Sequence, residues 1–152
     1  MARFALDRDI RFFEGVSREL VDAVVENTAV IFKMIIESTK TNIYGESLNK
    51  TYYPGVEVAC MIERGDTTVT YEGFGSDKGQ TTQFRFNRFS LEDKGVYPEI
   101  GDIIYHNDGY FEIDNVVEDQ LIGGRADAEF SIICSTFMTR KSTLQIEERN
   151  IW

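Results

Sequence analysis

The sequence predicts a mainly β fold: a small barrel or sandwich of about six to eight strands, with one short N-terminal helix and extended terminal arms. Short apolar segments alternate with polar residues, and turn-forming residues separate them. Aromatic residues make up 12% of the chain, which favours strands. A helical period is confined to one short segment. The length of 152 residues suits a single domain, residues 1–152.

The N-terminal part of the chain predicts an arm followed by a helix. Residues 1–16 show no cap and no clean period, so they predict an extended arm that packs on its own domain or on a neighbour. Its apolar anchors are Phe4, Leu6, Ile10, Phe12 and Phe13. Ser17 is a typical N-cap, which predicts a helix over residues 17–27. Its apolar residues Leu20, Val21, Val24 and Val25 fall at helical spacing on one face.

Residues 28–140 carry the strand pattern and form the predicted β domain. The predicted strands are residues 29–38, residues 54–65, two strands in residues 67–91 around a glycine-rich loop, residues 103–105, residues 110–114 and residues 130–138. Residues 91–102 predict a loop. The remaining residues, 141–152, form a charged tail that ends in Ile151 and Trp152.

The stretch YPEIGDIIYHNDGYFEIDNV, residues 97–116, holds the only histidine and is open to two interpretations. Asp102, His106 and Asp114 suggest a catalytic or metal site. However, Asn107-Asp108-Gly109 is favourable turn chemistry, because these residues accept the positive φ of a tight hairpin turn. Alternating residues flank this turn on both sides. The pattern therefore favours a plain hairpin.

Other candidate sites are no more specific. The loop GFGSDKGQ, residues 73–80, lacks the spacing of a phosphate-binding loop and lies between two strands. The 26 acidic residues offer no distinctive acid–base pair, and no GxSxG motif is present. We expect no catalytic residues, no metal and no cofactor.

The net charge of −10 limits the partners that this chain can bind. An acidic surface repels phosphate, so tight binding to nucleic acid or to an anionic membrane is not expected. No stretch is long and apolar enough to span a membrane, and the N-terminus lacks the apolar core of a signal peptide. The two cysteines, Cys60 and Cys134, lie in apolar strands and predict buried, reduced thiols of a protein made in the cytoplasm.

The order of these segments resembles the neck, or head-closure, proteins of T-even-like contractile-tailed bacteriophages. A short helix and a β-rich segment precede IYGES at residues 43–47, and FGSDKGQ with the aromatic strand QFRFNRF follows. PEIGDII and YFEID come next. The resemblance covers roughly residues 17–140 and leaves out the arm and the tail.

The resemblance implies a structural virion protein located in the neck, in the connector that joins the DNA-filled head to the tail. It implies a ring of copies, a hexamer or dodecamer, between portal or adaptor proteins above and tail-terminator or tail proteins below. DNA would pass through the ring without specific binding. Two hypotheses stand beside this one: another β-rich tail or baseplate protein, and a small β-barrel enzyme or ligand-binding protein.

Exposed apolar and acidic residues are the candidates for assembly. Tyr52 and Tyr53, next to Pro54, could form a contact patch or pack in the core. The expected subunit-interface residues are Phe4, Ile10, Phe12, Phe13, Tyr52, Tyr53, Ile151 and Trp152. The expected channel-lining residues are Asp77, Glu92 and Asp93.

Overall fold

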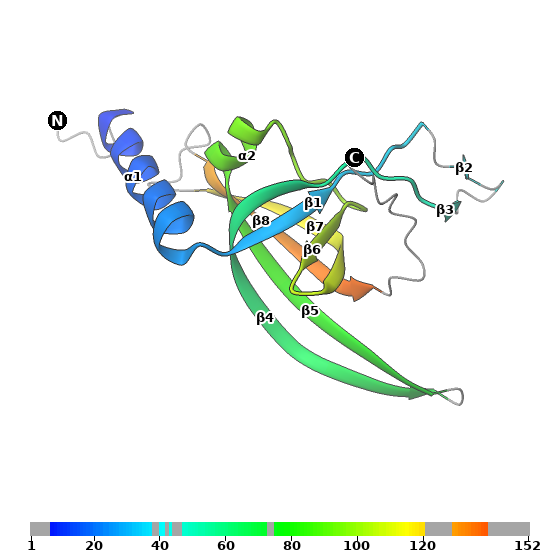
Figure 1. Cartoon of the computed structure of the whole chain (residues 1–152). Coiled ribbons are helices and arrows are strands. Elements are labelled where there is room, and N and C mark those ends of the chain that lie inside the picture. Colours follow the sequence, from blue (N-terminus) through cyan, green and yellow to red (C-terminus); the bar gives the residue numbers. More distant parts are fainter. Residues whose placement is uncertain are drawn as a thin grey trace, which may run out of the picture.

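The chain folds as a closed antiparallel barrel of six strands in the order β1-β4-β5-β8-β7-β6 (Figure 1). The computed structural model describes residues 7–37, 40–41, 43, 47–72, 75–120 and 129–139. The barrel strands are β1 (Thr28–Phe32), β4 (Val56–Glu72), β5 (Gly75–Asn87), β6 (Ile103–His106), β7 (Gly109–Gln120) and β8 (Glu129–Thr139). Two short strands, β2 (Lys40–Thr41) and β3 (Ser47–Asn49), pair separately. The predicted mainly β fold is confirmed.

The barrel interior is filled by the alternating apolar residues of its strands. Inward-facing residues recur at every second position, as the period of a pleated strand requires. The core residues are Ala29, Ile31, Val58, Cys60, Phe84, Phe86, Leu91, Val96, Ile104, Phe111, Ile113, Ile132 and Cys134.

β1 is shorter than predicted, and the residues that face the barrel interior are its odd-numbered ones. The predicted strand of residues 29–38 ends at Phe32, because the chain leaves the barrel there. Ala29 and Ile31 are buried, whereas Val30 and Phe32 are half-buried. Gly55 explains the close packing on this second face: a Cβ atom there would lie 2.4 Å from Val30 Cγ1.

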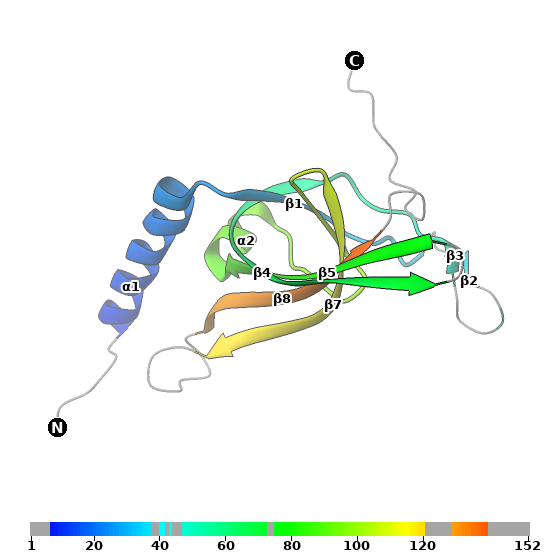
Figure 2. The ribbon, with the colours of Figure 1, turned by 90° about the horizontal axis from the view of Figure 1, so that it is seen from below.

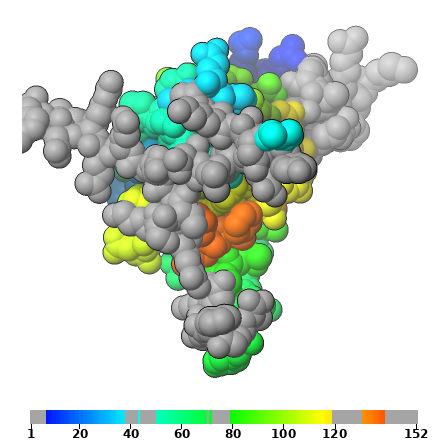
Figure 3. Space-filling model, turned by 90° about the vertical axis from the view of Figure 1, so that its right-hand side faces the viewer, coloured from blue at the N-terminus to red at the C-terminus, as the bar shows by residue number. Residues whose placement is uncertain are grey.

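β4 and β5 form a long hairpin that extends well beyond the barrel (Figures 1 and 3). The sequence predicted a break between residues 65 and 67, but β4 runs through this point with a register shift between Arg64 and Thr67. β5 pairs with β8 only from Thr81 onward, so the outer part of the hairpin is a two-stranded ribbon. This ribbon is one of the elements that project from the barrel.

The N-terminal helix begins before the predicted start and also projects from the barrel (Figures 1 and 2). Helix α1 spans Asp7–Glu19 and continues as the π-helix η1, Leu20–Val25. Residues 7–16, predicted as an extended arm, are therefore helical, and Ser17 lies inside the helix rather than at its N-cap. The segment ends at Glu26, which adopts a left-handed conformation with φ of 51°.

A second helix, α2, occupies part of a predicted loop. It spans Arg88–Lys94 between β5 and β6 and closes one end of the barrel with the buried side chain of Leu91. Gly95 ends the helix with φ of 67°, and its N–H donates to the carbonyl oxygen of Glu92. This is an ordinary glycine C-cap, so the sequence contained the stop signal of this helix.

Candidate functional site

The hairpin of residues 103–120 adopts the predicted turn and uses its polar side chains within the fold. Asn107 and Asp108 both have positive φ, and His106 pairs with Gly109 across the turn. His106 Nδ1 lies 3.0 Å from the carbonyl oxygen of Thr28, and its ring packs edge-on against Phe84. His106 therefore ties this hairpin to the start of β1.

Asp102 is buried and holds two loops together. Its carboxylate accepts hydrogen bonds from the backbone N–H groups of Met34 at 2.9 Å and Glu99 at 2.8 Å, and Lys33 Nζ lies 3.7 Å away. Burial raises the pKa of this carboxyl group above its ordinary value, although both backbone donors and Lys33 oppose the shift. Asp114, in contrast, is exposed on β7. In the part of the chain that the structure describes, no cluster of three or more His, Cys, Asp or Glu side chains could hold a metal ion.

The two cysteines are buried in neighbouring parts of the core, as predicted. Cys60 on β4 and Cys134 on β8 are free thiols. Burial raises the pKa of each thiol to about 12. Their role in the fold is that of small apolar side chains.

Among the described residues, exposed large apolar side chains are most numerous on the helical segment α1–η1. None of the 13 residues of α1 is buried, and in η1 only Val21 is. Five large apolar side chains remain exposed, and we call them the outer row: Phe12, Phe13, Val16, Leu20 and Val24. Phe12 and Val24, at its two ends, are 66% and 69% exposed. An apolar surface of this kind on a soluble chain is typical of an interaction site.

The segment η1 divides between two sides the apolar residues that the sequence predicted on one face. The sequence predicted Leu20, Val21 and Val24 on one face, together with Val25. In the structure Leu20 and Val24 lie one turn apart, about a quarter-turn around the helix from Val21 and Val25. Leu20 and Val24 therefore extend the outer row, whereas Val21 and the half-buried Val25 face the barrel. The sequence signal for this row is the spacing of four residues between successive apolar positions from Phe12 to Val24.

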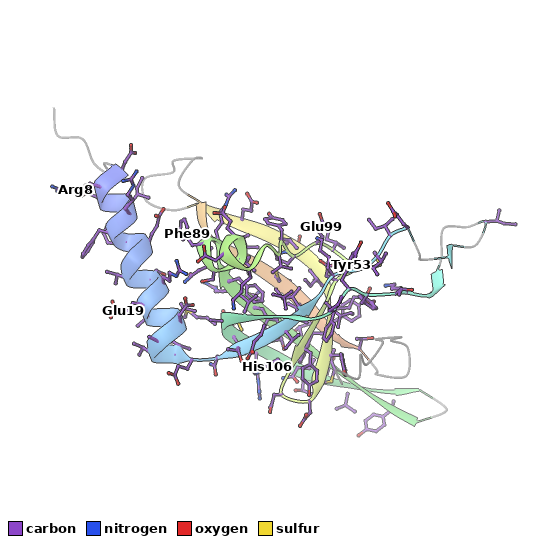
Figure 4. All side chains as sticks on the ribbon, turned by 45° about the horizontal axis from the view of Figure 1, so that its top comes forward. Arg8, Glu19, Tyr53, Phe89, Glu99 and His106 are labelled. Atoms are coloured by element: carbon purple, nitrogen blue, oxygen red, sulfur yellow. The ribbon has the colours of Figure 1, made fainter. Side chains whose placement is uncertain are left out.

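Polar contacts attach the helix to the barrel. Arg18 forms an ion pair with Asp93 of α2 and another with Asp22, at 3.5 Å. Ser90 Oγ donates to Asp22 at 3.4 Å. Beneath these contacts lies a cleft of about 370 Å³ that Glu57 and Lys94 also line. The helix is thus held at its C-terminal half, with its N-terminal half projecting (Figure 4).

The residues predicted for subunit contacts are distributed over several surfaces. Phe12 and Phe13 are exposed on α1 with their rings 5.9 Å apart, and Ile10 is half-buried. Tyr53 is exposed, whereas Tyr52 is only 6% exposed and packs inside the chain, which is one of the two roles that the sequence left open for it. Phe4, Ile151 and Trp152 lie outside the described residues.

The residues predicted to line a channel are not brought together. Glu92 and Asp93 lie on α2, where Glu92 forms an ion pair with Arg88 and Asp93 with Arg18. Asp77 belongs to the outer end of β5, where it pairs with Thr70 across the hairpin, and its side chain lies outside the described residues. The ten steps along β5 from Asp77 to Asn87, which precedes α2, amount to about 33 Å of strand at the usual rise.

Comparison with known proteins gives little beyond the fold. No protein family model matches the chain, and no curated protein matches it. One similar solved structure is a chain described as "Virion of native gene transfer agent (GTA) particle", with 13% sequence identity and a TM-score of 0.47. The match covers 74% of this chain and 93% of that chain. Among the described residues, no helix is long and apolar enough to cross a membrane.

Proposed function

We propose that this chain is a structural virion protein of a tailed bacteriophage, a neck or head-closure subunit that joins the head to the tail as part of a ring. The single observation that carries the proposal is the projecting helix: an amphipathic segment that buries one side chain in its own chain and exposes five large apolar ones. An exposed apolar helix of this kind is typical of a segment that binds another protein. The resemblance of IYGES and PEIGDII…YFEID to neck proteins supports the phage neck as the assembly to which the chain belongs.

The charge of the chain suits this role. A subunit with net charge −10 does not hold phosphate strongly, so a ring of such subunits lets DNA slide through. Glu92 and Asp93 are exposed at the end of the barrel that α2 closes, where they would form part of a channel rim. The ring, a hexamer or dodecamer, would contact portal or adaptor proteins on one side and tail-terminator or tail proteins on the other.

The test is to locate the chain in particles and to remove it. Phages lacking the gene should accumulate DNA-filled heads and free tails that do not join, and antibody labelling of wild-type particles should mark the head–tail junction. Label at the distal end of the tail would instead indicate a baseplate protein. Particles without label that remain infectious after deletion of the gene would refute a structural role.

A further inference from the structure

A second group of exposed apolar residues lies at the opposite end of the barrel from α1. β1 starts directly after the helical segment and crosses the barrel, so residues 33–36 emerge at its far end. Tyr53 is held there by the hydrogen bond from its N–H to the carbonyl oxygen of Lys33, at 2.8 Å. Glu99 is placed there by its 2.8 Å ion pair with Lys33, and Ile100 follows it. We call Ile36, Tyr53 and Ile100 the far patch; Figure 4 shows Tyr53 and Glu99 across the barrel from Arg8 and Glu19.

The far patch is as exposed as the outer row. Ile36 is 74% exposed, Ile100 is 65% exposed, and Tyr53 shows about half of its surface. Neither surface is covered by the described part of this chain. One chain therefore presents two apolar surfaces on opposite sides of its barrel, which is the arrangement that head-to-tail contacts between identical subunits require.

From these two surfaces we infer that the outer row of one copy binds the far patch of the next copy. This deepens the proposed function and rests on it, because a ring subunit needs two different surfaces that fit each other. The occupant of the outer row is thus a second copy of this chain rather than an unrelated protein.

The area of the outer row agrees with this assignment. Because a whole aromatic side chain carries about 150–250 Å² of surface, the five exposed side chains together present on the order of 500 Å². A stable interface buries about 800 Å² on each partner, of which a little over half is apolar. The outer row therefore supplies the apolar part of an ordinary subunit interface, and its polar flanks supply the rim.

The charges at the two surfaces are also compatible. Arg8 precedes Phe12 by one helical turn and thus heads the outer row, with 88% of its side chain exposed. The far patch is bordered by Glu99, whose side chain is 60% exposed, and by Glu37. Each surface also carries the opposite sign of charge, because Arg8 lies 3.5 Å from Asp9 and Glu99 is paired with Lys33. A head-to-tail contact can therefore place Arg8 against Glu37 or Glu99, and Asp9 against Lys33.

The experiment uses two surface variants of the full chain and mixes them. The row variant carries Val16→Glu and Leu20→Glu, and the patch variant carries Ile36→Glu and Ile100→Glu. Each variant should self-associate at least tenfold more weakly than the wild-type chain in sedimentation and native mass measurements. In an equimolar mixture the two should form a 1:1 dimer and nothing larger, because the intact patch of one meets the intact row of the other.

A control variant separates loss of contact from loss of folding. Gly15→Glu adds a carboxylate to the same helix, at a position where a Cβ atom would have no neighbour within 4 Å. This variant should associate like the wild-type chain, and all variants should retain the circular dichroism of the β barrel.

Several results would overturn the inference. A wild-type chain that stays monomeric at every attainable concentration would do so, as would a mixture that forms no dimer. A patch variant that still dimerises alone would show that two outer rows bind each other instead. These outcomes concern only the association of the purified chain. The proposed function is tested separately, by antibody labelling of particles and deletion of the gene.

Discussion

At the scale of single residues, Asp102 is a buried polar group around which the far end of the barrel is organised. It is 2% exposed and joins the loop after β1 to the loop before β6 through its two backbone donors. The sequence places Asp102 directly before the predicted strand of residues 103–105. It could not show that Met34, 68 positions earlier, supplies a donor, because that contact depends on the path of β1.

Asp102 should make stability depend on pH in a particular direction. Its pKa is raised in the folded chain, so the stability that it contributes is complete below its unfolded pKa of about 4 and is lost as pH rises through the folded pKa. Asp102→Asn mimics the protonated form. In urea unfolding from acid to neutral pH, the free energy of unfolding of the variant should therefore rise relative to that of the wild type above about pH 4. A difference that stays constant over this range would contradict the raised pKa.

The buried thiols should be unreactive until the chain unfolds. Cys60 and Cys134 are enclosed in the core with pKa values of about 12, so almost no reactive thiolate is present at neutral pH. A maleimide added to the native chain should label both residues at least a hundredfold more slowly than in urea, where the same chain provides the control. Fast labelling of either residue in the native chain would show that its strand opens easily.

Two glycines should respond in opposite ways to an added methyl group. At Gly55 a Cβ atom would lie 2.4 Å from Val30 and 2.8 Å from Phe32, so Gly55→Ala should lower the free energy of unfolding by about 1–3 kcal/mol. Gly15, in the middle of α1, has open space around it, and Gly15→Ala should leave the barrel unchanged while making the helix more stable by about 0.5–1 kcal/mol. Thermal unfolding of both variants tests this; equal effects would mean that the strands around Gly55 can move apart.

At the scale of elements, strands were easier to predict than helices. Val58, Cys60, Phe84 and Phe86 alternate strictly, and a half-buried strand leaves that pattern in its own sequence. Helix α1 has no clear N-cap, so its residues Ile10, Phe12 and Phe13 have the pattern of anchors in an extended arm rather than of a helix. Helix α2 is too short for its period to be recognised, and only Gly95 marked its end.

The turn of the β6–β7 hairpin should depend on the residue at position 107. Asn107 has φ of 48°, which asparagine and glycine tolerate and a β-branched residue does not. Asn107→Val should therefore destabilise the chain by about 1–2 kcal/mol, whereas Asn107→Gly at the same position should change stability little. Chemical denaturation of the pair decides this, since equal stability of the two variants would mean that the turn can adopt another conformation.

At the scale of the whole molecule, the fold separates stability from assembly. The core lies within the barrel and beneath α2, so the projecting helix and the outer hairpin contribute little to it. The candidate surface was predictable only in part. The sequence pattern identifies Phe12 and Phe13 as apolar anchors. Identifying the outer row requires the geometry of the helix, and identifying the far patch requires the course of β1. Surfaces formed by residues distant in sequence leave no period to detect.

Removing residues 1–14 should therefore abolish assembly without unfolding the barrel. The deletion takes away Phe12, Phe13 and the N-terminal half of α1, none of which is buried, and it leaves Arg18, Val21 and their contacts with the barrel in place. The truncated chain should unfold at nearly the wild-type temperature, because residues 7–14, the described part of the deleted segment, contain no buried residue. It should nevertheless fail to enter particles when it replaces the wild-type chain during phage assembly. A truncated chain that is folded and still incorporated would show that the contacts which matter lie elsewhere on the barrel, whereas one that does not fold would show that the helix stabilises the barrel more than its exposure indicates.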